Sequence, residues 1–86
     1  MRMINHDTVE FRSLYRWFAL EQDGRKPNTV RLLSRAEYDV LNRTKPSRVS
    51  IVCEDRSGFF ERDITWSGKI DDVLGQVLYM VCWETP

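Results

Sequence analysis

Residues that bind metals or perform nucleophilic catalysis are scarce in this sequence. It has one histidine, His6, and two cysteines, Cys53 and Cys82, among 86 residues. Structural zinc sites need several Cys or His ligands, and a catalytic thiol or hydroxyl needs a neighbouring base. The cysteines form no C-x-x-C pair and lie in apolar segments, which indicates two reduced thiols, although a disulfide between neighbouring strands remains an alternative. The sequence predicts no metal site and no nucleophile.

Glycine-rich loops and long apolar runs are also missing. The four glycines are too far apart to form a phosphate-binding loop. The most apolar segment, 73–83, is much shorter than the roughly 20 residues of a membrane-spanning helix. The first residues carry no apolar core typical of a signal peptide. We therefore expect no nucleotide cofactor, no membrane segment and a cytoplasmic location.

Acidic residues do cluster, but basic residues lie among them. The cluster consists of Glu54, Asp55, Glu61 and Asp63. Paired carboxylates can hold Mg²⁺, so a metal-dependent hydrolase using Glu61 and Asp63 is one alternative. Arg56 and Arg62 are interleaved with the acids, and this pattern favours cross-strand ion pairs. The sequence accordingly predicts no catalytic residue, no cofactor and no enzyme.

The composition that remains is that of a folded domain. Hydrophobic residues make up 42% of the chain and charged residues 30%, which is ordinary for globular proteins. Three Trp, three Tyr and four Phe supply large core side chains. Because a chain of this length forms one domain at most, we expect a single domain over 1–86.

The clearest secondary structure lies in the middle of the chain. Residues 28–33 ("NTVRLL") are typical of a short strand. Residues 34–43 predict a helix, since Ser34 and Glu37 form a capping box at its start. Pro46 then prevents this helix from continuing.

A hairpin is predicted after this helix, from residues 47–54 and 58–66. Its turn is "DRSG", in which Gly58 would adopt a positive φ. Alternation places two sets of side chains on single strand faces: Val49, Ile51 and Cys53 on the first strand, and Phe60, Ile64 and Trp66 on the second.

The segment 7–24 fits two structures. Helical spacing relates Phe11, Leu14, Tyr15 and Phe18. Gly24 follows at the place of a helix-ending glycine, and a helix is the interpretation we adopt. The alternative is a strand, because apolar and polar residues alternate from Val9 until Ser13 and Leu14 interrupt the pattern.

The tail "DDVLGQVLYMVCWETP" (71–86) also fits two structures. A helix from Asp71 would be apolar on all sides and would carry Gly75 inside it, which is unfavourable in a small protein. We prefer a helical turn over 69–74, ended by Gly75, and then a strand over 77–83 that is covered on both faces. The helix over 76–83 remains the alternative. Together these elements predict an α+β domain with an antiparallel sheet of three to four strands and two helices packed on it.

Charge is balanced overall but unevenly distributed. Residues 1–48 contain ten Lys/Arg against six Asp/Glu, whereas residues 49–86 contain three against seven. Nucleic-acid binding through the basic stretch 25–48 is therefore an alternative function. Its candidate residues are Arg25, Lys26, Arg31, Arg35, Arg43, Lys45 and Arg48.

Protein binding is the function that we favour from the sequence. Trp, Tyr, Met and Arg are enriched at interface cores. The candidate partner-binding residues are Trp66, Tyr79, Met80 and Trp83, with the acidic Glu61, Asp63, Asp71 and Asp72. We expect a non-enzymatic module that modulates or inhibits a larger partner, of the kind that phages and mobile elements encode against host nucleic-acid-handling proteins. An uncovered apolar face would also suit a second copy of the chain, so a homodimer is a further expectation.

Overall fold

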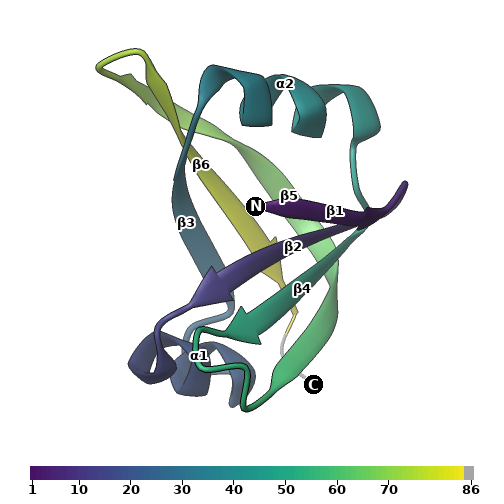
Figure 1. Ribbon diagram of the computed structural model, residues 1–86, viewed down its shortest axis with the longest axis vertical. Coiled ribbons are helices and arrows are strands. Elements are labelled where there is room, and N and C mark those ends of the chain that lie inside the picture. Colours follow the sequence, from purple (N-terminus) through teal and green to yellow (C-terminus); the bar gives the residue numbers. More distant parts are fainter. Residues whose placement is uncertain (85–86) are drawn as a thin grey trace.

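The structure, a computed structural model, describes residues 1–84 (Figure 1). In chain order the elements are β1 (Arg2–Asn5), β2 (Thr8–Ser13), α1 (Tyr15–Gln22), β3 (Asn28–Leu33), α2 (Arg35–Thr44), β4 (Arg48–Cys53), β5 (Phe59–Val73) and β6 (Gln76–Trp83). The strand predicted at 28–33 and the helix predicted at 34–43 are both confirmed.

The strands lie side by side in the order β1-β2-β4-β5-β6-β3. Neighbouring strands are antiparallel except β2 and β4, which are parallel. The predicted class, a small α+β domain with two helices, is confirmed, but three to four antiparallel strands is wrong, since the sheet is mixed and has six strands. The sequence interpretation missed β1 and assigned the residues of β2 to a helix, and so it did not foresee the parallel pair.

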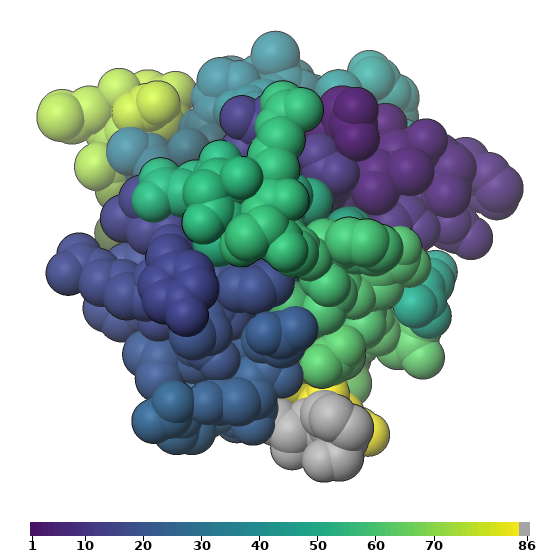
Figure 2. All heavy atoms as spheres, turned by 60° about the horizontal axis from the view of Figure 1, so that its bottom comes forward, coloured from purple at the N-terminus to yellow at the C-terminus, as the bar shows by residue number. Residues whose placement is uncertain are grey.

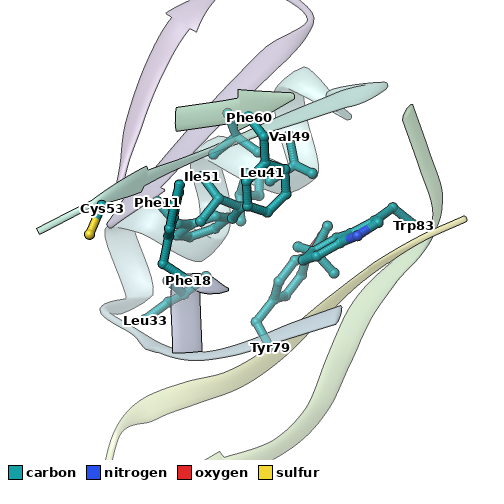
Figure 3. Close-up of a cluster of buried hydrophobic side chains, with 12 residues drawn as sticks. Phe11, Phe18, Leu33, Leu41, Val49, Ile51, Cys53, Phe60, Tyr79 and Trp83 are labelled. Carbon is teal, nitrogen blue, oxygen red and sulfur yellow. The ribbon is translucent and has the colours of Figure 1, made fainter. Parts of the chain in front are cut away.

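Strand β5 belongs to two half-sheets. Its residues 59–63 pair with β4, and together with β2 and β1 they form the first half-sheet. Its residues 64–73 pair with β6, and together with β3 they form the second half-sheet. The two half-sheets face each other, so the side chains of their inner faces meet in one core (Figure 3).

Aromatic rings join the two half-sheets across the core. The buried side chains include Val9, Phe11, Val49, Ile51, Cys53 and Phe60 from the first half-sheet, and Tyr79, Val81 and Trp83 from the second. The rings of Phe60 and Trp83 lie edge to face, with their centroids 5.9 Å apart. Edge-to-face pairs of this kind add to the stabilisation that comes from burial alone.

The two helices lie at opposite ends of the core (Figure 1). Helix α2 buries Leu41, and its Tyr38 ring lies edge-on to Tyr79 at 6.1 Å. Helix α1 buries Phe18, whose ring lies 5.5 Å from that of Phe60. In the part of the chain that the structure describes, neither helix has the length and apolar character needed to cross a membrane.

The segment 7–24 contains both of the structures considered for it. The helix that we adopted for the whole segment is wrong over residues 8–13, which form β2. Val9 pairs with both β4 and β1, Phe11 pairs with β4, and both side chains are buried; these contacts override the helical spacing. The alternation ends at Ser13, where α1 follows, and Gly24 ends that helix with a φ of 89° as expected.

The hairpin of β4 and β5 is confirmed, with a different turn. Val49, Ile51 and Cys53 are all buried on one face, as the alternation predicted. The prediction of a positive φ at Gly58 is wrong, because Arg56 takes the left-handed conformation with a φ of 61°. Strand β5 also continues past the predicted end at 66 as far as Val73.

The tail forms the strand β6, as preferred, and the helix over 76–83 is excluded. The helical turn predicted over 69–74 is wrong, because these residues extend β5, which pairs with β6 down to Val73 and Gln76. Leu74 and Gly75 alone connect the strands, and both have a positive φ, of 50° and 82°. This is the geometry of a type I′ turn, whose usual sequence signal is Asn-Gly.

We predict that Ser34→Ala lowers the free energy of unfolding by about 1 kcal/mol. The Ser34 hydroxyl accepts a hydrogen bond from the Glu37 N–H at 3.1 Å, and Glu37 accepts one from the Ser34 N–H at 2.9 Å. Urea unfolding followed by circular dichroism measures the change. Ser47→Ala, at an exposed serine outside any helix, is the control and should leave stability unchanged; equal losses in both variants would contradict the capping role.

Candidate protein-binding surface

The outer side of the second half-sheet is apolar. Along β6, Val77, Tyr79, Val81 and Trp83 face the core, whereas Leu78, Met80 and Cys82 face outward and are half-buried. The register places Val30 and Leu32 of β3 beside Met80 and Leu78, and Trp66 of β5 beside Cys82. We call this surface the apolar face; it consists of Val30, Leu32, Trp66, Leu78, Met80 and Cys82.

No helix covers the apolar face within residues 1–84. Helix α2 reaches β6 from the inner side, as the contact of Tyr38 with the buried Tyr79 shows, and α1 packs against the first half-sheet. As a result 42% of Val30, 50% of Leu32 and 51% of Trp66 remain exposed. The tail strand therefore has one covered face and one uncovered face.

A β-bulge turns Trp66 outward. The pairing of β5 with β6 shifts between Ile64 and Trp66, which leaves Thr65 as an extra residue. Ile64 packs against the core, but Trp66 lies on the other side of the sheet. The prediction that Phe60, Ile64 and Trp66 share one face is therefore wrong for Trp66, because the extra residue inverts the alternation.

Gly68 allows the Trp66 ring to approach the backbone closely. A Cβ placed at Gly68 would lie 3.0 and 3.2 Å from two carbons of the Trp66 indole. The indole thus covers the glycine, and a side chain at position 68 would push it away. Glycine in a strand interior weakens the strand, so its use here marks a close approach of the ring to the backbone.

The tip of the β5–β6 hairpin carries further exposed apolar groups. This tip, coloured yellow-green, projects from the body of the molecule (Figure 2). Leu74 is 100% exposed, and Ile70 and Val73 beside it are also exposed. Ile70 is the extra residue of a second bulge. A fully exposed leucine in a left-handed turn adds no stability to the fold. Residues of this kind are typical of functional positions.

The outer side of the first half-sheet is charged instead. Arg48 contacts Asp63 at 2.6 Å and Glu61 at 3.4 Å, and Arg2 contacts Glu10 at 3.1 Å. Cross-strand ion pairs therefore form, but with Arg48; within residues 1–84 the interleaved Arg56 and Arg62, on which the expectation rested, form none, and Arg62 donates to the backbone carbonyls of Glu61 and Gln22. In residues 1–84 no group of three or more His, Cys, Asp or Glu could hold a metal ion.

The predicted partner-binding residues lie in different parts of the structure. Trp66 and Met80 lie on the apolar face, and Asp71 lies beside Leu78 at its margin. Tyr79 and Trp83 are buried in the core. Asp72 lies on the inner side of the β5–β6 hairpin and pairs with Lys69 and Arg35, which hold the pKa of its carboxyl below the usual value. Glu61 and Asp63 lie on the charged outer side described above.

Val30, Leu32, Leu78 and Cys82 belong to the apolar face but were not among the predicted residues. Simple alternation in "NTVRLL" would place Arg31 outward and its apolar neighbours inward. The structure has the opposite arrangement, because Arg31 bonds to groups on the inner side. Both cysteines are free thiols, Cys53 in the core and Cys82 half-buried on the apolar face.

Ion pairs occupy most of the basic stretch 25–48. Arg25 pairs with Asp23, Lys26 with Glu21, Arg35 with Asp72, and Arg48 with Asp63 and Glu61. Arg31 donates hydrogen bonds to Arg12 O, Ser13 Oγ and Thr29 Oγ1. Within residues 1–84 this leaves Arg43 and Lys45 as the candidate cations without an ion pair or a hydrogen-bonded side chain.

A buried polar network around Glu21 accounts for the positions of the Lys26 and Arg31 side chains. The Glu21 side chain is 1% exposed and accepts hydrogen bonds from Ser13 Oγ at 2.7 Å and Lys26 Nζ at 3.0 Å. Burial lowers the pKa of the Arg31 guanidinium, and the Glu21 carboxylate opposes that shift. A buried carboxylate is costly to the fold unless such partners bond to it.

Comparison of this chain with family models, with curated proteins and with solved structures finds no match.

We predict that Lys26→Met lowers the free energy of unfolding by about 2 kcal/mol, because it leaves the buried Glu21 carboxylate without its cation. The matched control is Arg25→Met at the next position. Its partner Asp23 is exposed, and exposed ion pairs contribute little, so stability should stay almost unchanged. Thermal unfolding of both variants measures the difference, and equal effects would contradict the role assigned to Glu21.

We predict that Leu74→Asn raises the free energy of unfolding by about 1 kcal/mol, because asparagine tolerates the left-handed conformation and Leu74 packs against nothing. The control is Gly75→Ala, which should lower the free energy of unfolding. Open space surrounds this position, so only the strained φ of 82° opposes the added methyl group. Calorimetry of both variants gives the values. A loss of stability in Leu74→Asn would show that this turn differs from type I′.

Proposed function

We propose that this chain is a protein-binding module that uses its apolar face to contact and modulate a larger partner. The observation that supports the proposal is an exposed, contiguous set of apolar side chains on three neighbouring strands, with no helix over them in residues 1–84. Exposed patches of this kind mark interaction sites in soluble domains.

The chemistry of the apolar face suits an interface core. Trp and Met are among the types enriched in such cores, and Trp is also enriched among hot-spot residues. The Trp66 ring lies against Gly68, so one side of it already contacts the sheet while 51% of the side chain remains exposed. Charged residues are confined to the margin, where Asp71 lies beside Leu78, and this matches the polar rim of known interfaces.

The alternative function, nucleic-acid binding through residues 25–48, has weaker support. Phosphate binding needs cations that are free to release counterions. Four of the seven candidates are paired with carboxylates, and Arg31 is bonded to neutral groups on the inner side of the fold. A homodimer, an inhibitor encoded by a phage or mobile element, and the absence of enzymatic activity stay predictions.

The experiment is affinity capture from cells of the source organism with matched surface variants. The double variant Leu32→Ser/Trp66→Ser should lose the captured protein, since each change removes an exposed apolar contact. Hot-spot substitutions usually weaken binding by about 2 kcal/mol or more, which is roughly thirtyfold. The control is Phe59→Ser, because Phe59 is an aromatic residue that is 63% exposed on the charged outer side.

Retained capture by Leu32→Ser/Trp66→Ser, or equal loss in the Phe59 control, would refute the proposal. Gly68→Ala supplies a second arm that leaves every apolar side chain in place. It should shift the Trp66 ring, change the tryptophan fluorescence and weaken capture. Sedimentation at micromolar concentration separates a homodimer from a foreign partner.

A further inference from the structure

The backbone of β3 has a free edge. Pro27 O accepts a hydrogen bond from Trp83 N at 3.1 Å, which fixes the phase of the ladder between β3 and β6. Bonded and non-bonded pairs alternate along an antiparallel ladder, so the odd-numbered residues of β3 bond to β6. The N–H and C=O groups of Val30 and Leu32 therefore point away from β6, toward the open side of the sheet. Such an edge is a template for another strand.

A groove follows this edge. Two cavities of about 670 and 680 Å³ lie along β3, the first lined by Leu32 and the second by Val30, and Arg31 lines both. The opposite wall is the end of β2, which approaches β3 in Figure 1. Strands β2 and β3 are not paired to each other. The groove is thus the seam at which the sheet fails to close into a barrel.

Arg31 bridges the seam with its side chain. Its guanidinium donates to the carbonyl of Arg12 and, at 2.7 Å, to the hydroxyl of Ser13, both on β2. It also lies over the Phe11 ring at 5.3 Å. The two strands are therefore held a side-chain length apart, and the backbone of β3 keeps its open edge.

Cations without ion pairs line the first cavity. Within residues 1–84, Arg12 and Arg56 are exposed and have no ion pair. The acids in the same cavity are engaged: Glu10 pairs with Arg2, and Glu37 accepts the Ser34 N–H. Glu54 lines only the second cavity, so the excess of positive charge lies at the first, beside Leu32.

We infer that the partner supplies an extended segment of alternating apolar and acidic residues, which pairs with β3 as an additional strand. Its backbone bonds to Val30 and Leu32, its acidic side chains lie on the outward side, where Arg12 and Arg56 are exposed, and its apolar side chains point inward, where Phe11 and Leu33 line the groove. The inference rests on the proposed function, because the added strand lies at the margin of the apolar face. Main-chain pairing supplies affinity in this mode, and alternate side chains supply specificity.

The chemistry disfavours the other occupants of the groove. A second copy pairing β3 with its own β3 would bring Arg12 and Arg56 of both copies to one seam, and like charges there repel. Nucleic acid has no backbone pattern that matches a strand edge. An acidic peptide strand satisfies both the free backbone groups and the unpaired cations.

The test uses labelled peptides of about six residues, the usual length of a strand, in fluorescence anisotropy and in amide NMR of the whole chain. An alternating Val-Glu peptide should bind and shift the amide signals of Val30 and Leu32. An alternating Val-Lys peptide and a single-stranded DNA oligonucleotide are the comparison probes.

Two variants separate charge from backbone pairing. Arg12→Glu/Arg56→Glu should weaken Val-Glu binding about tenfold or more, whereas Arg43→Glu/Lys45→Glu, at exposed cations of the α2 end, should not. Val30→Pro removes a free edge N–H that is not part of the β6 ladder, and it should abolish binding. If Val30→Pro does not fold, a Val-Glu peptide N-methylated at alternate residues gives the same readout and should not bind.

Val-Glu binding that depends on Arg12, Arg56 and the edge N–H supports the inference. Equal binding of Val-Lys, preferential binding of the oligonucleotide, or a stable dimer joined through β3 would each overturn it. If the Val-Glu peptide does not bind but capture of the partner still depends on Trp66, the inference is overturned and the proposed function stands. Peptide binding with capture unaffected by Leu32→Ser/Trp66→Ser would refute the proposed function, and the inference that rests on it, while the edge itself still binds peptides.

Discussion

The shared strand β5 is the constraint on which the rest of this fold depends. Because its two parts pair with different neighbours, β4 and then β6, one strand joins both half-sheets and turns their inner faces toward each other. The bulge at Thr65 lets Phe60 and Ile64 fill the core while Trp66 passes to the outer side. A regular strand would have placed Trp66 with the core residues, and the outer side would have lost its largest apolar group. The places of Phe60 and Ile64 in the core and of Trp66 on the apolar face therefore follow from a single extra residue.

The open seam is the second consequence of this arrangement. In a closed barrel β3 would have paired with the opposite edge, which consists of β1 and of the end of β2 that β1 does not cover. Here a guanidinium takes the place of backbone pairing, and the network of Ser13, Glu21 and Lys26 supports the same region. Natural proteins usually protect such edges with charge, bulges or cover. A free edge that adjoins an uncovered apolar face is the combination expected of a strand-binding module, and it supports the proposed function.

Local signals predicted the elements that depend on local physics. The Ser34–Glu37 box, the "NTVRLL" strand and the helix-ending Gly24 each act within a few residues, and each prediction is confirmed. The failures depend on distant contacts. Phe11 fits the helical spacing as well as the strand alternation, and only the pairing of β2 with β1 and β4 decides between them. The Leu74–Gly75 turn lacks its usual Asn, and neither the bulge at Thr65 nor the inward direction of Arg31 has a sequence signal. The candidate surface was therefore predicted in part: Trp66 and Met80 lie on it, but Tyr79 and Trp83 belong to the core.

Amide hydrogen exchange of the chain alone tests whether β3 presents a free edge beside the apolar face. Thr29 and Arg31 donate their N–H groups to β6 in the ladder, so their amides should exchange slowly. The amides of Val30 and Leu32, one residue away, should exchange much faster because they face the groove. Equal protection of all four amides in a monomer would show that the seam is closed, and it would contradict this account.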